Sequence, residues 1–384
     1  MRILLALAIL VACGGDDAIV PNTAFDAAVH DSTLPQSDAQ NDSQSAADAS
    51  DAANTRGLHV EGNKLVDHGK VVRLLGVNHS GGEYACEQGY GIFEGPTDDT
   101  LVSPMLTWKA NTVRLPLNEQ CWLGINGVKA QYAGKNYQDA LAALVAVFRK
   151  HNMYVILDLH FGAPGTHLAD AQQPMLDADH GPAFWKEVAA AYKGDAGVLF
   201  DVFNEPYLDS SNIAGGTDPW ACLQNGCTAK LQRGSTGDYQ TAGTQSLVDA
   251  IRSTGAENVI MVPGLAYTSD LSGWLTHEPK DPKGNIAASN HLYNFNGCSD
   301  VTCWDSRYKA ISQTVPLITG ENGEDDCAHG FIDGYMGWAD ALGTSYLGWT
   351  WNTWDCKSGP ALITDYTGTP TAFGQGLMKH LQGL

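Results

Sequence analysis

VLFDVFNEP, at residues 198–206, is an apolar run that ends in an amide, a carboxylate and a proline. Apolar runs of this length, bounded by turn residues, are typical of strands buried on both faces. Taken alone, Glu205 would be expected in a solvated loop after such a strand. Whether it belongs to a functional site depends on how the other strands of the chain end.

Seven further runs of this kind are spread along the chain. They are VVRLLGVNH (71–79), NTVRLPL (111–117), YVILDLH (154–160), NVIMVPG (258–264), AASNHLYNF (287–295), VPLITGENG (315–323) and SYLGWTWN (345–352). Helical patterns lie between them, for example at 137–152, 181–194 and 239–255. Nearly continuous apolar runs are typical of parallel strands that are covered on both faces. The alternation predicts an α/β fold, a (β/α)8 TIM barrel, over residues 57–384.

A doubly wound open sheet is the alternative architecture. It would need a phosphate-binding glycine loop, and neither GxGxxG nor GxxxxGK[ST] follows any of the runs. A serine esterase is disfavoured in the same way, because no serine lies in a GxSxG elbow. The formal net charge of −21 at pH 7 argues against a groove for nucleic acid, which must neutralise phosphates.

Polar or aromatic residues close seven of the eight predicted strands. The carboxyl ends of barrel strands meet at one face, where the active sites of such barrels lie. One polar end is readily accidental, but seven at the same face indicate a shared site. These residues are Asn78, His79, Arg114, His160, Asn204, Glu205, His291, Tyr293, Glu321 and Trp351.

This set of residues suits glycoside hydrolysis, which needs two carboxyl groups flanking the glycosidic oxygen. One carboxyl donates a proton, and the other is ionised as a nucleophile or as a base for water. Glu205 and Glu321 end the fourth and seventh predicted strands, on opposite sides of the ring. We expect Arg114 to keep one carboxylate ionised and Tyr293 to donate a hydrogen bond to it.

Supporting or structural roles are expected for other polar and aromatic residues. Asn204 is expected to bond the sugar 2-OH, and Trp351 to stack under a sugar ring. Asp158 lies inside an apolar strand and is expected to satisfy polar groups of the barrel. Solvated loop positions are expected for three glutamates, namely Glu83, Glu87 and Glu119.

The joint pattern resembles glycoside hydrolase family 5, a retaining, cellulase-like family of (β/α)8 barrels. The family places Arg on strand 2, His on strand 3, Asn-Glu-Pro on strand 4, His-x-Tyr on strand 6, Glu on strand 7 and Trp on strand 8. The matching residues are Arg114, His160, Asn204, Glu205, Pro206, His291, Tyr293, Glu321 and Trp351. By this resemblance Glu205 is the acid/base and Glu321 the nucleophile, and no cofactor is needed.

The first strand departs from the pattern of many endoglucanases in the family. They read GVNW, whereas this chain has His79 in place of the aromatic and continues into a long loop, GVNHSGGEYACEQGYGIFEGP (76–96). Loops after barrel strands set specificity. The expected substrate is a β-linked polysaccharide or oligosaccharide, cut as by an endo-β-1,4-glucanase. A β-mannanase, a β-galactanase, an exo-acting enzyme, a transglycosylase and a non-catalytic glycan-binding lipoprotein are alternatives.

The N-terminus has the features of an export signal. MRILLALAILVAC combines Arg2 with an apolar segment too short to span a bilayer. LVAC resembles a bacterial lipobox, which predicts a signal peptide over 1–12 and a lipidated Cys13. Residues 13–56 are rich in Asp, Ala and Ser and predict a disordered tether with a reach of about 35 Å. The expected location is the cell surface or outer membrane, with secretion as the alternative.

The nine cysteines fit export, because eight remain for disulfides once Cys13 is set aside. Spacing suggests the pairs Cys222–Cys227 and Cys298–Cys303. Cys86–Cys121 and Cys327–Cys356 are one of the possible pairings of the other four. No CxxC pair points to zinc, and no metal is expected. A monomer is expected, attached to the membrane only through the lipid on Cys13.

Overall fold

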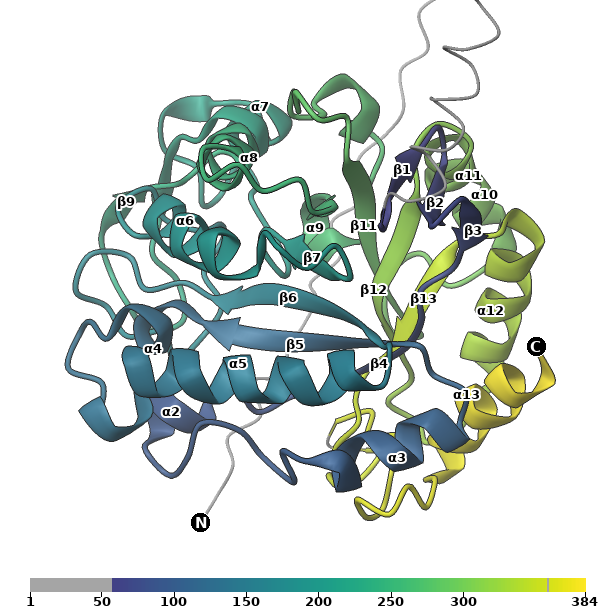
Figure 1. Ribbon diagram of the computed structural model, residues 1–384. Coiled ribbons are helices and arrows are strands. Elements are labelled where there is room, and N and C mark those ends of the chain that lie inside the picture. The colour runs from purple at the N-terminus through teal and green to yellow at the C-terminus, as the bar shows by residue number, and fades with distance from the viewer. Residues whose placement is uncertain (1–56, 358) are drawn as a thin grey trace, which may run out of the picture. The chain divides into compact units, whose positions relative to one another are not determined.

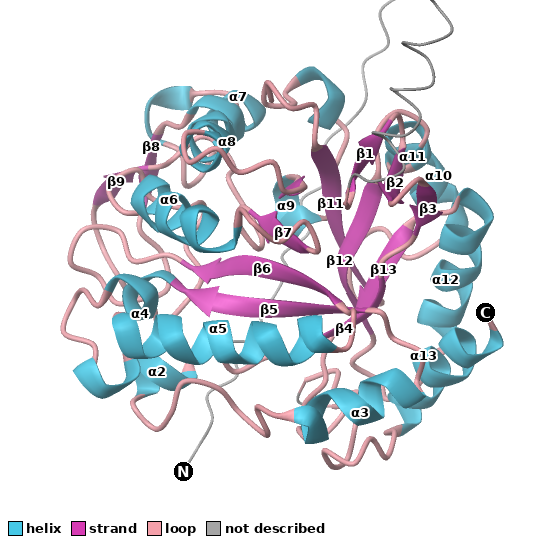
Figure 2. Cartoon of the chain, viewed as in Figure 1, coloured by secondary structure: helices cyan, strands magenta, loops and turns pink. Residues whose placement is uncertain are grey.

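The computed structural model describes residues 57–357 and 359–384. The predicted signal peptide, Cys13 and the whole predicted tether therefore lie outside the described residues. Within the described part, eight parallel strands close into a barrel, with helices around it (Figures 1 and 2). In chain order these strands are β4 (Leu75–Asn78), β5 (Thr112–Asn118), β6 (Tyr154–Phe161), β7 (Val198–Asp201), β10 (Ile260–Val262), β11 (Ile286–Tyr293), β12 (Leu317–Gly323) and β13 (Ser345–Gly348). The predicted (β/α)8 architecture is confirmed.

The barrel strands pair in chain order, and β13 closes the ring against β4. All eight predicted runs contain or largely cover one barrel strand, as expected. The run at 71–79 contains β4 and also begins inside β3 (Lys70–Val72), which belongs to a separate small sheet. The run at 198–206 ends as a strand at Asp201, so that Asn204 and Glu205 lie in the loop that follows.

The small sheet consists of β1 (His59–Glu61), β2 (Lys64–Asp67) and β3, paired antiparallel. Leu58 and Leu65 from this segment join one apolar cluster with side chains that the barrel strands contribute. The other buried members of this cluster are Leu74, Ile156, Leu199, Val259, Met261, Ala287, Ile318 and Leu347. Because most of these residues belong to or flank the barrel strands, β1–β3 complete the apolar interior of the barrel.

The helices form the outer layer and pack on the strands through a second, larger apolar core. The longer ones are α3 (Asp99–Thr107), α5 (Lys135–Lys150), α6 (Gly181–Tyr192), α8 (Thr244–Arg252), α12 (Gly330–Leu342) and α13 (Ala372–Gly383). Short helices are α2 (Ala85–Gln88), α4 (Glu119–Leu123), α7 (Pro219–Asn225), α9 (Leu265–Thr268), α10 (Val301–Arg307) and α11 (Lys309–Ser312), with 3₁₀ turns η1 (Ala130–Tyr132), η2 (Ala214–Gly216) and η3 (Trp274–Thr276). In the described part of the chain, no helix has the length and apolarity to cross a membrane.

Two predicted helices match α5 and α6 closely, but the third was placed too early. The pattern at 239–255 begins inside a hairpin of β8 (Thr228–Lys230) and β9 (Asp238–Gln240), and only α8 is helical. Residues 238–240 pair with β8, so their backbone bonds are made across the hairpin and not along a helix.

Four disulfides connect the eight cysteines of the described residues. They are Cys86–Cys121, Cys222–Cys227, Cys298–Cys303 and Cys327–Cys356. All four predicted pairs are present. The first connects α2 to α4, so it joins the loops that follow β4 and β5.

Candidate active site

Glu205 and Glu321 meet at the carboxyl ends of the barrel strands. Glu205 follows β7 by four residues, and Glu321 lies in β12 beside His291 of β11, with which it is in register. One carboxylate oxygen of each glutamate and a ring nitrogen of His291 all lie within 4.8 Å of one another. The expectation that the fourth and seventh strands bring two carboxyl groups together therefore agrees with this geometry.

Glu321 is held by two donors. The Arg114 guanidinium donates to one carboxylate oxygen at 2.8 Å, and the Tyr293 hydroxyl donates to the other at 2.5 Å. Glu321 is buried, so these charge-assisted bonds replace water and fix the orientation of the carboxylate. Both partners are those expected from the sequence.

Arg114 is the centre of a buried network of charges and amides. It is the third residue of β5, in register with Asn78 at the end of β4, and is fully buried. Besides Glu321, its guanidinium contacts Asp158 and Asp201 at 3.0 Å, Asn204 at 2.9 Å and Asn78 at 3.1 Å. Burial alone would lower the pKa of Arg114, but the charges of Asp158, Asp201 and Glu321 outweigh it and raise the pKa. A permanent positive charge therefore lies beneath Glu321.

Glu205 has a different environment. Nδ1 of His291 lies 2.9 Å from one of its oxygens, and the Gln172 amide donates to its backbone carbonyl. Burial, and after it the negative charge of Glu321, raises the pKa of Glu205 well above its usual range. Burial also holds the pKa of His291 well below normal, so the imidazole is neutral. One carboxyl group therefore favours its protonated form while its neighbour is surrounded by donors.

His160 and Asn204 complete the floor of the site. Asp158 accepts from Nδ1 of His160 at 2.7 Å, which confirms that Asp158 satisfies polar groups of the barrel. Nδ2 of Asn204 lies 3.2 Å from Nε2 of His160, while its oxygen accepts from Arg114. Burial lowers the pKa of His160 to about 3. The imidazole is thus neutral, and Asn204 is fixed from both ends of its amide.

Trp351 does not have the position expected of a sugar platform. It is 0% exposed, and its ring packs edge-on against Trp108 at 4.7 Å between centroids. The prediction that Trp351 stacks under a sugar ring is wrong. Trp349, the residue directly after β13, is only partly buried and stacks on His160 at 5.6 Å. Trp349 therefore presents the aromatic surface next to the catalytic-site residues.

His79 and the long loop after β4 also differ from expectation. His79 is buried, with Nδ1 3.1 Å from the Trp351 carbonyl, so it supports the loop after β13 and is closed to substrate.

Glu83 and Glu119 were expected in solvent, but both are buried. Glu83 accepts from the backbone of Gly81, and burial raises its pKa to about 8. Glu87 is partly buried.

Three residues of the site were missed from the sequence. Asp201 lies in the run at 198–206 and could have been noticed as a carboxylate inside an apolar strand, as Asp158 was. Trp349 lies near a predicted strand end, as do Trp122, Trp220, Trp304 and Trp354, and the sequence alone did not single it out from them. Gln172 comes from the loop after β6 and carries no local signal.

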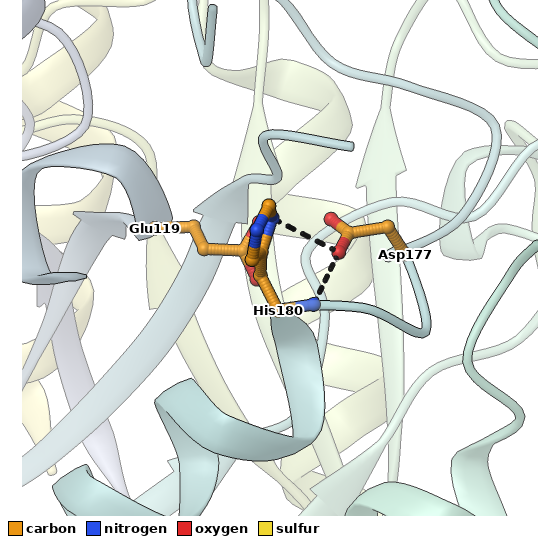
Figure 3. A group of neighbouring side chains, drawn as sticks. All are labelled: Glu119, Asp177 and His180. Carbon is orange, nitrogen blue, oxygen red and sulfur yellow. Dashed lines mark hydrogen bonds and ion pairs between the residues drawn. The ribbon is translucent and has the colours of Figure 1, made fainter. Parts of the chain in front are cut away.

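Two groups of carboxylates with a histidine come close enough in the described residues to share an ion. One is Glu205, His291 and Glu321. The other is Glu119, Asp177 and His180, between the loops after β5 and β6 (Figure 3). In the first group, Arg114 and Tyr293 already bind Glu321, so a cation would meet a positive charge within hydrogen-bonding distance of its ligand.

Comparison with known proteins places the chain in a family. Residues 66–357 match the family described as Cellulase (glycosyl hydrolase family 5). The chain belongs to glycoside hydrolase family 5. This family-5 protein is 23% identical over 311 residues to a mannan endo-1,4-beta-mannosidase of Streptomyces lividans, covering 77% of this chain and 66% of that protein. It is 24% identical over 306 residues to Endoglucanase E-5 of Thermobifida fusca, covering 77% and 55%. It thus spans less than two thirds of the length of either relative.

Solved structures share the fold of this chain. The β-glucanase SdGluc5_26A of Saccharophagus degradans, in complex with cellotetraose, superimposes with a TM-score of 0.65 at 21% identity, over 85% of this chain and 93% of that one. The catalytic domain of a mannanase from Streptomyces sp. SirexAA-E gives 0.58 at 22% identity, over 84% and 89%.

Proposed function

We propose that this chain is a retaining glycoside hydrolase that cleaves β-linked polysaccharide, with Glu205 as acid/base and Glu321 as nucleophile. The observation that carries the proposal is the asymmetry of two close carboxyl groups. Glu321 accepts from Arg114 and Tyr293, whereas Glu205 is partly buried beside a neutral histidine. Such a pair provides one ionised carboxylate and one proton donor at the same bond.

The separation of the carboxyl groups supports retention. Carboxyl groups about 5–5.5 Å apart leave room for direct attack on the sugar, whereas about 6.5–9.5 Å leaves room for a water. Oxygens of Glu205 and Glu321 lie within 4.8 Å of each other. In the proposed reaction, Glu321 attacks the anomeric carbon while Glu205 protonates the leaving oxygen, and a glycosyl–Glu321 ester forms. Water then attacks the anomeric carbon and Glu205 takes its proton, while the bond from that carbon to Glu321 breaks and Glu321 leaves as a carboxylate.

The same electrostatics let Glu205 change role between the two steps. The negative charge of Glu321 is the second cause of the raised pKa of Glu205. Once Glu321 is esterified that charge is gone, so the pKa of Glu205 falls and the ionised form becomes available as a base. Arg114 stays charged throughout and stabilises Glu321 again when the ester is cleaved.

We propose an endo-β-1,4-glucanase as the first activity and a β-mannanase as the second. The family match and Endoglucanase E-5 support the first. The two mannan endo-1,4-beta-mannosidases among the relatives support the second; that of Salipaludibacillus agaradhaerens is 21% identical, and the match covers 92% of its length. Galactan cleavage and exo action are further outcomes of the same test.

The activity test is release of reducing sugar by the full-length protein from a panel of polysaccharides. The panel contains carboxymethyl cellulose, mixed-linkage glucan, mannan, xylan and galactan. Glu205→Gln should lower the rate by about 10²- to 10⁴-fold, because it removes the acid of the first step and the base of the second, and Glu321→Gln by at least as much, because no glycosyl ester can form.

Glu61→Gln in β1 is the matched control and should keep full activity, because Glu61 lies in the small sheet outside the barrel. Activity close to wild type in either active-site variant would overturn the assignment of both glutamates. A folded protein that releases no reducing sugar from any substrate would instead favour a non-catalytic glycan-binding role.

A further inference from the structure

A second acidic cluster lies outside the proposed active site. Glu119 is the first residue of α4, directly after β5, while Asp177 and His180 come from the segment between β6 and α6. One carboxylate oxygen of each acid and a ring nitrogen of His180 lie within 4.8 Å of one another. Figure 3 shows the side chains of Glu119 and Asp177 extending toward the His180 ring from opposite sides of the view.

Each carboxyl group of this cluster uses only one of its oxygens. Oε2 of Glu119 accepts from the Ala163 backbone at 2.6 Å, and Oδ1 of Asp177 accepts from the His180 backbone at 2.8 Å. Oε1 of Glu119 and Oδ2 of Asp177 have no hydrogen-bond donor among the described residues. Both residues are 0% exposed, so water at the surface does not donate hydrogen bonds to these two oxygens.

Two buried carboxyl groups in contact need a positive partner between them. An uncompensated pair of buried charges would cost several kcal/mol. A single shared proton is one solution, and the raised pKa of Glu119, due to burial and then to the charge of Asp177, fits it. A cation is the other solution, and it also explains why a histidine joins the group.

We propose that Glu119, Asp177 and His180 bind one divalent cation of the Zn²⁺ or Mn²⁺ type. Such ions accept both carboxylate oxygen and imidazole nitrogen, whereas Ca²⁺ and Mg²⁺ take oxygen ligands. Ligands about 2.0–2.2 Å from an ion lie no more than about 4.4 Å apart, so the observed limit of 4.8 Å requires only small adjustment.

The surroundings of the cluster suit a bound ion. The Ala163 carbonyl lies 3.0 Å from Nδ1 of His180, the ring nitrogen that also lies 3.7 Å from Oδ1 of Asp177, so this carbonyl adds a further oxygen beside the cluster. The His180 side chain is 24% exposed and gives access from solvent. The ion would join the start of α4 to the start of α6, and it shares no residue with the glutamate pair of the proposed function.

The test is isothermal titration of the tag-free, chelator-dialysed full-length protein with Zn²⁺ and with Mn²⁺ at pH 7. The protein carries Glu205→Gln and Glu321→Gln, so that the other carboxylate group does not contribute. One equivalent of at least one of these ions should bind. Adding Glu119→Gln or His180→Ala should weaken binding at least tenfold.

His151→Ala is the matched control, because His151 also pairs with a carboxylate, Asp99, but in an exposed position. It should leave binding unchanged. His180→Ala removes a partly exposed side chain, so it keeps the test valid if Glu119→Gln does not fold. Absence of binding up to millimolar ion, or binding unchanged by both cluster variants, would overturn the proposal in favour of a shared proton. Because binding is measured without turnover, this outcome is independent of the proposed glycosidase activity.

Discussion

At the scale of single residues, Arg114 connects Glu321 to the buried carboxylates and amides of the neighbouring strands and loops. Its guanidinium contacts Glu321, Asp158, Asp201 and the amides of Asn78 and Asn204. The sequence predicted its pairing with Glu321, because the ends of neighbouring barrel strands meet at one face. It did not predict the partnership with Asp201, since that carboxylate lies in a strand whose inward-facing residues cannot be assigned from an all-apolar run.

The first prediction concerns the charge coupling between the glutamates. Glu321→Gln removes the negative charge next to Glu205, so the pKa of Glu205 should fall, although burial keeps it above the usual value. A ¹³C NMR titration of the glutamate carboxyl carbons measures this, with Glu61→Gln as the control that leaves it unchanged.

The sign of the pH dependence follows in the wild type. Glu205 must be protonated to act as an acid, so kcat/KM should decline as the pH rises through its raised pKa. An unchanged or higher pKa of Glu205 in Glu321→Gln would show that the two carboxyl groups are not coupled.

At the scale of elements, apolar runs located the barrel strands because helices cover their outer face and the packed interior of the barrel covers their inner face. The short strands β1–β3 were not predicted. β1–β3 are three or four residues long, and their alternation is too brief to distinguish from loop sequence. The wrong assignment of Trp351 has a related cause. The run at 345–352 was predicted as one strand with Trp351 at its end, but β13 ends at Gly348, and Trp351 lies in the core against Trp108.

Replacing each tryptophan by alanine should therefore have a different effect, on KM for Trp349 and on the free energy of unfolding for Trp351. Trp349→Ala should raise KM about fivefold to tenfold on the best polysaccharide, roughly 1 kcal/mol, because an aromatic surface beside His160 is lost. Trp351→Ala should lower the free energy of unfolding by about 3–5 kcal/mol, because it leaves a large cavity. Steady-state kinetics and urea unfolding of both variants separate these effects, and a reversed pattern would restore Trp351 as the platform.

At the scale of the whole described molecule, disulfides connect the loops that surround the site. Cys86–Cys121 closes a separation of 35 residues and joins α2 to α4, whereas Cys222–Cys227 closes a separation of only 5. Spacing along the chain indicated the two close pairs, whereas the two long pairs depend on the barrel, because only the fold brings residues of successive loops together.

Loop length predicts how much each disulfide stabilises the fold. Crosslinks that close longer loops remove more entropy from the unfolded chain, about 4 kcal/mol for 35 residues against about 2 kcal/mol for 5. The double variant Cys86→Ala, Cys121→Ala should therefore lose about twice as much free energy of unfolding as Cys222→Ala, Cys227→Ala. Equal losses in urea unfolding, or the reverse order, would contradict this account.

The central claim is that Glu321 forms a covalent intermediate which Glu205 helps to make and break. The most direct test treats the full-length protein with an activated 2-deoxy-2-fluoro β-glycoside matched to its best polysaccharide, followed by mass spectrometry of the peptides. The account predicts one glycosyl adduct per chain, located on Glu321 and absent from Glu321→Gln. An adduct on another residue, or none in a protein that hydrolyses the matched polysaccharide, would contradict it.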